Sequence, residues 1–290
     1  MTMTGAGQVR EEGEAVTVVR PAAPGIAPGR LVFASPHSGD LYPDDLDADP
    51  ALPLSSLRSA EDALVDRLIR AGPDHGAALV LARYGRAYVD LNRDPADLDP
   101  HLVDGLDHPP SPRSAAGYGV IPRLTGDGRT IHARRLALDE ARDRVARVHG
   151  PWKAALDTAV AGALTRHGEA ILIDWHSMPE RATRARGGPR GPDVVLGDRH
   201  GSSCSPELTR ALRAAFEALG WRVALNHPYA GGWTTQSRGR PEEGVHAIQI
   251  ELNRALYFDE AARVPGPGWS RTQKGVTRVI AALGSLRLGT

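Results

Sequence analysis

Polar residues that could bind a metal or move a proton stand at the ends of apolar segments far apart in the sequence. His37 follows "RLVFASP", His176 ends "EAILIDWH", and Glu251 lies in "VHAIQIEL". Imidazoles, a carboxylate and an open fourth position are typical of a catalytic zinc site. A carboxylate that does not bind the metal can take a proton from the water that the metal activates. These residue types therefore indicate a hydrolytic metal centre.

Three further polar residues occupy similar positions. Asn92 and Arg93 end "AYVDLNR", and Asp174 stands two residues before His176. An arginine fork fits a substrate carboxylate in bidentate fashion. Each residue also has an ordinary structural interpretation. Asn92-Arg93 could be a solvated salt-bridge corner, and Asp174 could be a turn residue at the end of a strand.

The single residues differ in how easily a structural role explains them. His37 alone could be a hydrogen-bonded structural histidine. Glu251 is harder to explain in this way, because Ile250 and Leu252 flank it and indicate that it is buried. A buried acid is costly unless it is paired, and unpaired buried acids are typical of functional sites. The joint pattern, more than any single residue, favours a catalytic site.

The elements that must position these side chains follow from apolar periodicity. Strands are predicted at 30–36, 77–84, 87–91, 169–176, 193–198, 221–226 and 245–252. Helices are predicted at 59–72 with Ser59 as N-cap, at 205–220 with Ser205 as N-cap, and at about 268–285. The segment 132–168 is predicted to hold two helices broken at Gly150-Pro151.

The alternation of strands and helices predicts one α/β fold. We expect a mixed, mostly parallel sheet with helices on both faces. In such sheets ligands bind at the carboxyl ends of the strands, which is where His37, His176 and Glu251 stand.

Composition limits the classes of partner. Lys plus Arg and Asp plus Glu number 35 each among 290 residues, so no long-range field favours nucleic acid or a membrane surface. One cysteine, Cys204, excludes an internal disulfide framework, and no apolar run is long enough to span a bilayer. The polar start lacks the apolar core of a signal peptide. We expect a cytoplasmic protein with a mobile tail at 1–14 and a single catalytic domain at 15–290, acting on a small molecule.

Long ordered motifs show a family resemblance. The segments "SPHSGDLYP", "EDALVDRL", "RAYVDLNRDP", "IDWHSMP" and "NHPYAGGWTTQSRGRPEEGVHAIQIELNR" resemble those of the N-formylglutamate amidohydrolases, over roughly residues 28 to 262. More distantly, the chain is similar to zinc carboxypeptidases and aspartoacylases. The resemblance implies a three-layer α/β/α fold and one zinc per chain. It also implies hydrolysis of N-formyl-L-glutamate to formate and a free amino acid, usually in histidine degradation.

The resemblance also implies a set of metal ligands. His37 and His176 match the two zinc-binding histidines. Asp62, expected in the first turn of the next helix, matches the family's acid and is the favoured third ligand. Glu61 and Asp40 are alternatives for that role, and Asp40 has the His-x-x-acid spacing from His37.

The remaining roles are implied in the same way. Glu251 matches the general base, and Asn92 with Arg93 matches the carboxylate-binding corner. Arg240 in "GRP" is expected to bind a second carboxylate. Asp174 is expected to orient a metal ligand, or to support the site from the end of its strand, without binding the metal itself.

One motif departs from the family pattern. Where many members have Thr-x-His-Tyr-Gly-Arg-Pro, this chain has "TQSRGRP", with Ser237 and Arg238 in place of the histidine and the aromatic residue. The substrate could therefore be another N-acyl amino acid or a peptide. A binding protein that has lost its chemistry is the remaining alternative, and the retained His37, His176 and Glu251 argue against it.

Overall fold

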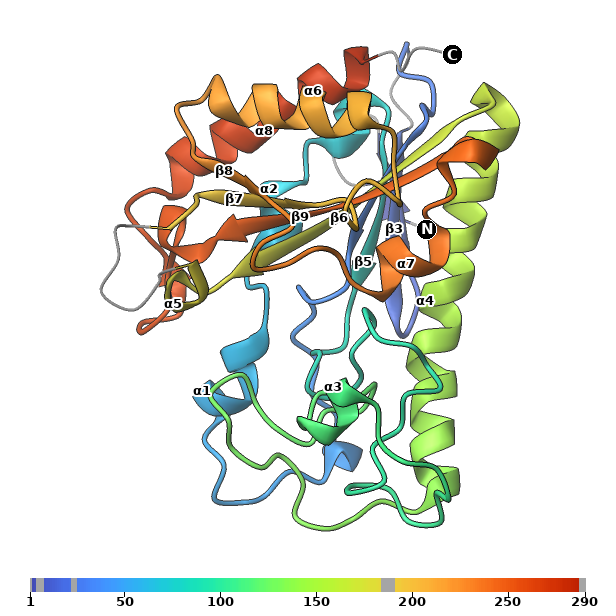
Figure 1. Cartoon of the computed structure of the whole chain (residues 1–290), viewed down its shortest axis with the longest axis vertical. Coiled ribbons are helices and arrows are strands. Elements are labelled where there is room, and N and C mark those ends of the chain that lie inside the picture. The colour runs from blue at the N-terminus through green and yellow to red at the C-terminus, as the bar shows by residue number, and fades with distance from the viewer. Residues whose placement is uncertain (1, 4–7, 22–24, 184–190, 287–290) are drawn as a thin grey trace.

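The computed structural model describes residues 2–3, 8–21, 25–183 and 191–286, and a mixed sheet lies at its centre (Figure 1). The strand order is β1-β2-β3-β5-β4-β6-β9-β7-β8. The strands are β1 (Thr2–Met3), β2 (Gln8–Glu12), β3 (Val16–Pro21), β4 (Leu31–Ser35), β5 (Ala78–Ala82), β6 (Ala170–Met178), β7 (Val194–Gly197), β8 (Val223–Leu225) and β9 (Val245–Asn253). The central strands β5, β4, β6 and β9 pair in parallel, whereas β3 and β7 join them in antiparallel fashion. The predicted mixed α/β sheet is confirmed.

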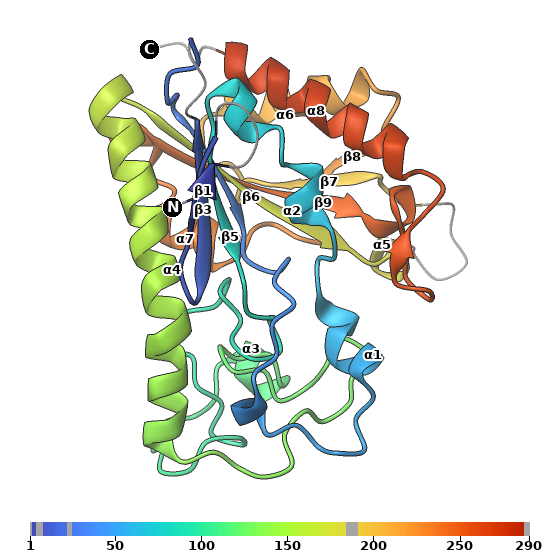
Figure 2. The same cartoon turned by 180° about the vertical axis from the view of Figure 1, so that it is seen from behind.

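Helices cover both faces of the sheet (Figures 1 and 2). The helices are α1 (Leu54–Leu57), α2 (Val65–Leu68), α3 (Pro112–Ala115), α4 (Leu138–His167), α5 (Glu180–Thr183), α6 (Pro206–Glu217), α7 (Trp233–Arg238) and α8 (Trp269–Ser285). A small hairpin of β10 (Phe258–Asp259) and β11 (Val264–Pro265) precedes α8. In the part of the chain that the structure describes, no helix is both long and apolar enough to cross a bilayer.

One apolar core lies on each face of the sheet, between the sheet and the helices that cover that face. The molecule therefore has three layers. Along β6, Leu172 packs into the core that contains Trp152 of α4, whereas Ile171 and Ile173 face the core that contains Phe216 of α6. Side chains alternate across a strand, and both faces here are buried, so every residue of β6 is buried. This explains why the strand is a continuous apolar run instead of an alternating one.

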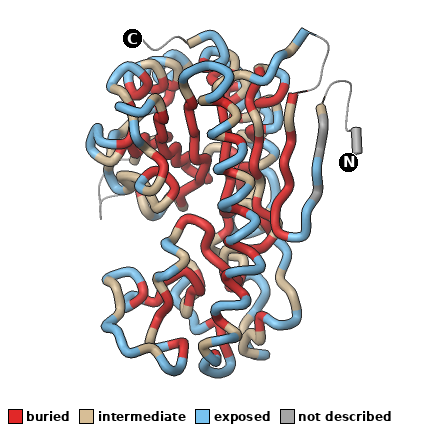
Figure 3. Tube along the Cα trace, turned by 90° about the vertical axis from the view of Figure 1, so that its right-hand side faces the viewer, coloured by how far each residue is buried: buried red, intermediate tan, exposed pale blue. Residues whose placement is uncertain are grey.

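A loop-rich region lies beyond the carboxyl ends of the central strands, in the lower half of Figure 1. It contains α1 and α3, and α4 extends past the sheet to run beside it (Figure 2). Buried residues of this region, including Val120 and Ile131, belong to the same core as Val32 of β4 and Leu172 of β6. Buried stretches therefore occur in both halves of the molecule, as Figure 3 shows.

The N-terminal prediction was wrong for the described residues of the segment 1–14. Instead of a mobile tail, β1 pairs with β2, and β2 pairs with β3 in a hairpin at the edge of the sheet. Backbone hydrogen bonds pair an edge strand whatever its side chains are, so its polar composition gave no signal. The strand β3 was not predicted either, although Val16, Val18 and Val19 are buried.

Two internal predictions were also wrong. Residues 87–91 turn instead of forming a strand, because Tyr88 N donates to Gly85 O at 2.9 Å and Asn92 N to the Asp90 carboxylate at 3.0 Å. The predicted break at Gly150-Pro151 is absent: α4 continues with Pro151 inside it. Pro151 removes one helical hydrogen bond, and burial of Trp152 against the sheet offsets this loss.

The predicted helix at 59–72 is reduced to α2 with a 3-10 turn at Arg58–Ala60 before it. Leu64 adopts a left-handed conformation with φ 65°. Asp62 N donates to His37 O at 2.9 Å. This hydrogen bond holds the chain between Ala60 and α2 against the segment that comes after β4. Asp62 therefore lies beside His37. The predicted helices at 205–220 and 268–285 are confirmed as α6 and α8.

Candidate metal centre and active-site pocket

A cavity of about 700 Å³ opens between the carboxyl ends of the central strands and the loop-rich region. His37 enters it from the segment after β4, His176 from β6 and Glu251 from β9. Asn92 and Arg93 line it from the turn that follows β5. The structure therefore brings together most of the predicted site residues at the sheet edge where they were expected.

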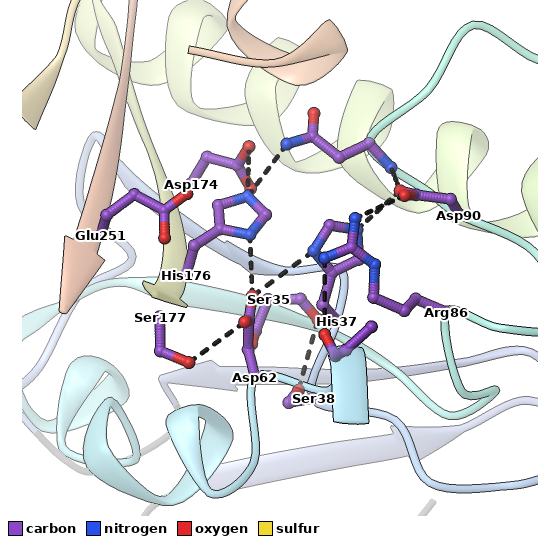
Figure 4. Close-up of polar contacts among 12 residues, drawn as sticks. Ser35, His37, Ser38, Asp62, Arg86, Asp90, Asp174, His176, Ser177 and Glu251 are labelled. Carbon is purple, nitrogen blue, oxygen red and sulfur yellow. Dashed lines mark hydrogen bonds and ion pairs between the residues drawn. The ribbon is translucent and has the colours of Figure 1, made fainter. Parts of the chain in front are cut away.

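Three side chains converge on one point in this cavity (Figure 4). The atoms that His37, Asp62 and His176 could offer to a metal ion all lie within 4.8 Å of one another, and all three residues are buried. Asp62 Oδ2 lies 2.9 Å from His176 Nδ1 and 3.4 Å from His37 Nδ1. His37 Nδ1 is buried without a hydrogen-bond partner among the described residues. A buried nitrogen in that state suits a metal ligand, because a metal ion would accept its lone pair.

The far side of each imidazole faces a carboxylate. His37 Nε2 lies 2.6 Å from Asp90 Oδ1, and His176 Nε2 lies 3.0 Å from Asp174 Oδ2. The Asp90 carboxylate can accept the ring N–H of His37 and leave Nδ1 free to bind a metal. Asp174 is an ion-pair neighbour of His176 Nε2, and its oxygens have no hydrogen-bond partner among the described residues. The donor set of two imidazoles and one carboxylate thus suits zinc with one position left open.

The charge state of Asp62 suits the same role. Burial opposes ionisation, but the imidazoles of His176 and His37 outweigh it and hold the pKa of Asp62 well below its usual range. Of the three acids considered from the sequence, Asp62 is the one placed with the histidines.

The two alternatives to Asp62 lie elsewhere. Glu61 is buried but points into a separate cluster, where it accepts hydrogen bonds from Tyr42 Oη at 2.6 Å and Arg58 Nε at 2.9 Å. Asp40 leaves 73% of its side chain exposed and pairs with Arg58 at 3.7 Å. Among the described residues, neither Glu61 nor Asp40 belongs to the set that lines the cavity.

Glu251 is buried beside the metal-ligand group without belonging to it. It is the register partner of His176 on the neighbouring strand, and Gln249 Nε2 donates to its Oε1 at 2.8 Å. Burial raises the pKa of Glu251 to about 7. A carboxyl with that pKa can both accept and release a proton near neutral pH.

Asn92 and Arg93 form a fixed corner of the cavity. Asn92 Oδ1 accepts from Thr234 N at 2.8 Å, and its Nδ2 lies 3.0 Å from His176 Nε2. A Cβ atom on Gly232 would lie 2.3 Å from Asn92 Nδ2, so only glycine permits this close approach. Arg93 donates to two carbonyl oxygens, those of Tyr118 and Asn92, each at 3.0 Å.

Arg240 does not reach the cavity, so its predicted role in substrate binding is not supported. It is exposed, its Nε donates to Glu243 at 3.1 Å, and its Nη1 donates to Ser237 O at 2.9 Å. Ser237 and Arg238, the departures from the family motif, also lie away from the cavity lining, and Arg238 donates to Asp157 at 3.0 Å.

Sequence reasoning missed four polar residues that support the site. Asp90 uses its second oxygen to bind Arg86 Nη2 at 2.6 Å. Ser177 and Arg254 contact Asp62 Oδ1 at 3.1 and 3.2 Å. Asp90 and Arg254 lie inside the motifs "VDLNR" and "ELNR", so their proximity to Asn92 and Glu251 was the available signal.

Comparisons with known proteins identify the family of the chain. The N-formylglutamate amidohydrolase family model matches residues 29–258. The N-formylglutamate deformylase of Pseudomonas aeruginosa is 32% identical over 235 residues, which cover 80% of this chain and 83% of that protein. The enzyme of the same name from Pseudomonas putida is 29% identical over 233 residues, covering 79% and 82%. The crystal structure of N-formylglutamate amidohydrolase from Ralstonia eutropha JMP134 has a TM-score of 0.86 and 34% identity, covering 93% of this chain and 97% of that chain. The chain therefore belongs to the N-formylglutamate amidohydrolase family.

Proposed function

We propose that this protein hydrolyses the formamide bond of N-formyl-L-glutamate, or of a closely related N-acyl amino acid, to formate and the free amino acid. We further propose that His37 Nδ1, His176 Nδ1 and Asp62 Oδ2 would hold one zinc ion per chain. The observation that carries the proposal is that these atoms converge in the same cavity as Glu251. Membership of a family of amide hydrolases supports it.

The metal and the protein would have separate tasks. When bound, zinc makes water more acidic and polarises the carbonyl of the substrate. Asp90 would keep the His37 imidazole in the orientation and tautomer that ligation requires, and the Asp174 carboxylate lies beside the His176 imidazole.

Glu251 is the proposed general base. It takes a proton from the attacking water and returns it to the nitrogen of the departing amine. Its burial in the wall of the cavity, in register with His176, suits both transfers. Strand pairing with β6 fixes its position relative to His176.

We propose that arginines stabilise two negative charges. One is the charge of the substrate carboxylate, and the other is the charge that develops on the carbonyl oxygen during attack. Arg93 and Asn92 bind a substrate carboxylate at the fixed corner. Arg86 is proposed to stabilise the developing oxyanion. Asp90 supports this assignment, because its two oxygens hold His37 and Arg86, each at 2.6 Å, and so keep the guanidinium beside the proposed metal site.

The test is to measure formate released from N-formyl-L-glutamate and N-formyl-L-aspartate, and acetate released from N-acetyl-L-aspartate, by the zinc-loaded protein. We expect the highest kcat/KM for N-formyl-L-glutamate. A higher kcat/KM for another N-acyl amino acid would support the proposed amide hydrolysis but assign a different substrate. No hydrolysis of any of them by protein with full zinc content would overturn the proposal.

A further inference from the structure

The two oxygens of Asp62 have different surroundings. Oδ2 faces the imidazole nitrogens of His176 and His37. Oδ1 points the other way, where it accepts hydrogen bonds from Ser177 Oγ at 3.1 Å and from Arg254 Nη2 at 3.2 Å. Asp62 is buried and lies at the wall of the cavity.

Arg254 and Ser177 are also bonded to each other. Arg254 Nε lies 3.1 Å from Ser177 Oγ. The guanidinium has no acceptor lone pair, so the serine oxygen accepts from Arg254 and donates its own hydrogen to Asp62. The three side chains thus form a closed ring of hydrogen bonds.

The ring connects the elements that carry the catalytic groups. Ser177 directly follows His176 on β6, and Arg254 directly follows β9, three residues after Glu251. Asp62 comes from the irregular segment before α2, which has no regular structure to fix it. The backbone of Asp62 is held by the hydrogen bond from its N to His37 O, and the contacts with two strand ends fix its carboxylate.

From this geometry we propose that Arg254 and Ser177 are positioning residues that hold Asp62 as a one-oxygen metal ligand. The inference rests on the metal site proposed above. The hydrogen bonds to Oδ1 favour binding of a metal through Oδ2 alone, which would leave a coordination position for water and substrate. Groups that orient a ligand in this way typically change metal affinity by about 10- to 100-fold when they are removed.

Arg254 could instead be a substrate ligand, since it also lines the cavity. Its surroundings favour the positioning role. The side chain is 7% exposed, and Nη1 is already directed at Ser59 O at 3.2 Å and at Glu260 Oε2 at 3.5 Å. Each of its three nitrogens thus has a partner in the protein.

The experiment compares zinc affinity, measured by competition with a chelator and without substrate, in four proteins: wild type, Arg254→Lys, Ser177→Ala and Arg181→Lys. Lysine keeps the charge of Arg254 but cannot bridge Ser177 and Asp62. Arg181→Lys is the matched control, because Arg181 lines the same cavity and donates to Gly126 O at 2.8 Å instead of to Asp62. The absorption spectrum of each Co²⁺-loaded protein reports the coordination geometry.

We expect Arg254→Lys and Ser177→Ala to weaken zinc binding by about 10- to 100-fold and to alter the Co²⁺ spectrum, with Arg181→Lys unchanged. Equal affinities and spectra in all four proteins would overturn this inference alone. Wild type that binds no metal would overturn the proposed function instead. An Arg254→Lys protein with normal zinc affinity and a raised KM would make Arg254 a substrate ligand. Circular dichroism of the metal-free proteins checks folding, and Ser177→Ala decides the matter if Arg254→Lys does not fold.

Discussion

His176 and Glu251 are paired in register on the neighbouring parallel strands β6 and β9. Register partners in a sheet project from the same face, so the proposed metal ligand and the proposed base enter one cavity from adjacent backbones. Both strands are buried along their whole length. The separation of the two groups is therefore set by the sheet and not by a loop, as a site with fixed geometry requires.

The metal ligands can be tested by removing each imidazole. Purified wild type should contain about one zinc per chain, as three protein ligands with an open position require. His37→Ala and His176→Ala should lose zinc and formate release together. Elemental analysis beside an activity assay measures both, and stoichiometric zinc in either variant would contradict the ligand assignment.

The choice among the three acids can be tested by a matched pair of substitutions. Asp62→Asn should weaken zinc binding strongly, because an amide is a poorer zinc ligand than a carboxylate. Asp40→Asn should have little effect, since the Asp40 side chain is 73% exposed and contacts Arg58. Zinc affinity by chelator competition separates them, and the reverse order would transfer the role to Asp40.

Glu251→Gln should separate metal binding from chemistry. The substitution keeps size and hydrogen bonding but removes the base, so zinc content should stay near that of wild type. Turnover should fall by roughly 10²–10⁴-fold, the usual contribution of a positioned general base. Steady-state kinetics on zinc-loaded protein provides the measurement. A near-normal kcat would eliminate the proposed mechanism even with correct zinc content.

The strand ends were predictable because the strands are buried on both faces. The predicted strands at 30–36, 169–176 and 245–252 correspond to β4, β6 and β9, and their ends place His37, His176 and Glu251 at one edge. Apolar runs of this kind indicate buried parallel strands whatever the tertiary structure is. The central part of the site was therefore accessible from the sequence.

The loop-borne groups were less predictable, since long-range contacts determine their conformation. The segment 59–72 has a helical pattern, but a hydrogen bond from Asp62 N to the His37 carbonyl and the left-handed Leu64 override it in its first half. Asp90 lies in a turn where the pattern indicated a strand. Arg240 belongs to a matching motif, yet its side chain points to Glu243. A motif fixes which residues are present but not where their side chains point.

The raised pKa of Glu251 predicts how the stability of the metal-free protein depends on pH. Because the folded-state pKa is about 7 against an ordinary 4.5, folding favours the protonated carboxyl, and this contribution is lost as pH rises through 7. Between pH 5 and pH 8, wild type should therefore lose up to about 3 kcal/mol of unfolding free energy relative to Glu251→Gln. Urea unfolding in the presence of a chelator measures the difference. Parallel pH profiles of the two proteins would show that Glu251 is not buried as described.

The arginine that binds substrate can be identified with two substitutions of the same kind. Arg93→Ala should mainly raise KM for N-formyl-L-glutamate, because it removes carboxylate binding that is common to the ground state and the transition state. Arg93→Lys should recover only part of the affinity, since an ammonium cannot form the bidentate contact. Arg240→Ala is the control: Arg240 is exposed, pairs with Glu243 and lies outside the described cavity lining, so its KM should match wild type. If kcat also falls in Arg93→Ala, the guanidinium acts on the transition state as well. A raised KM in Arg240→Ala with a normal KM in Arg93→Ala would reverse the assignment and place the substrate carboxylate near α7.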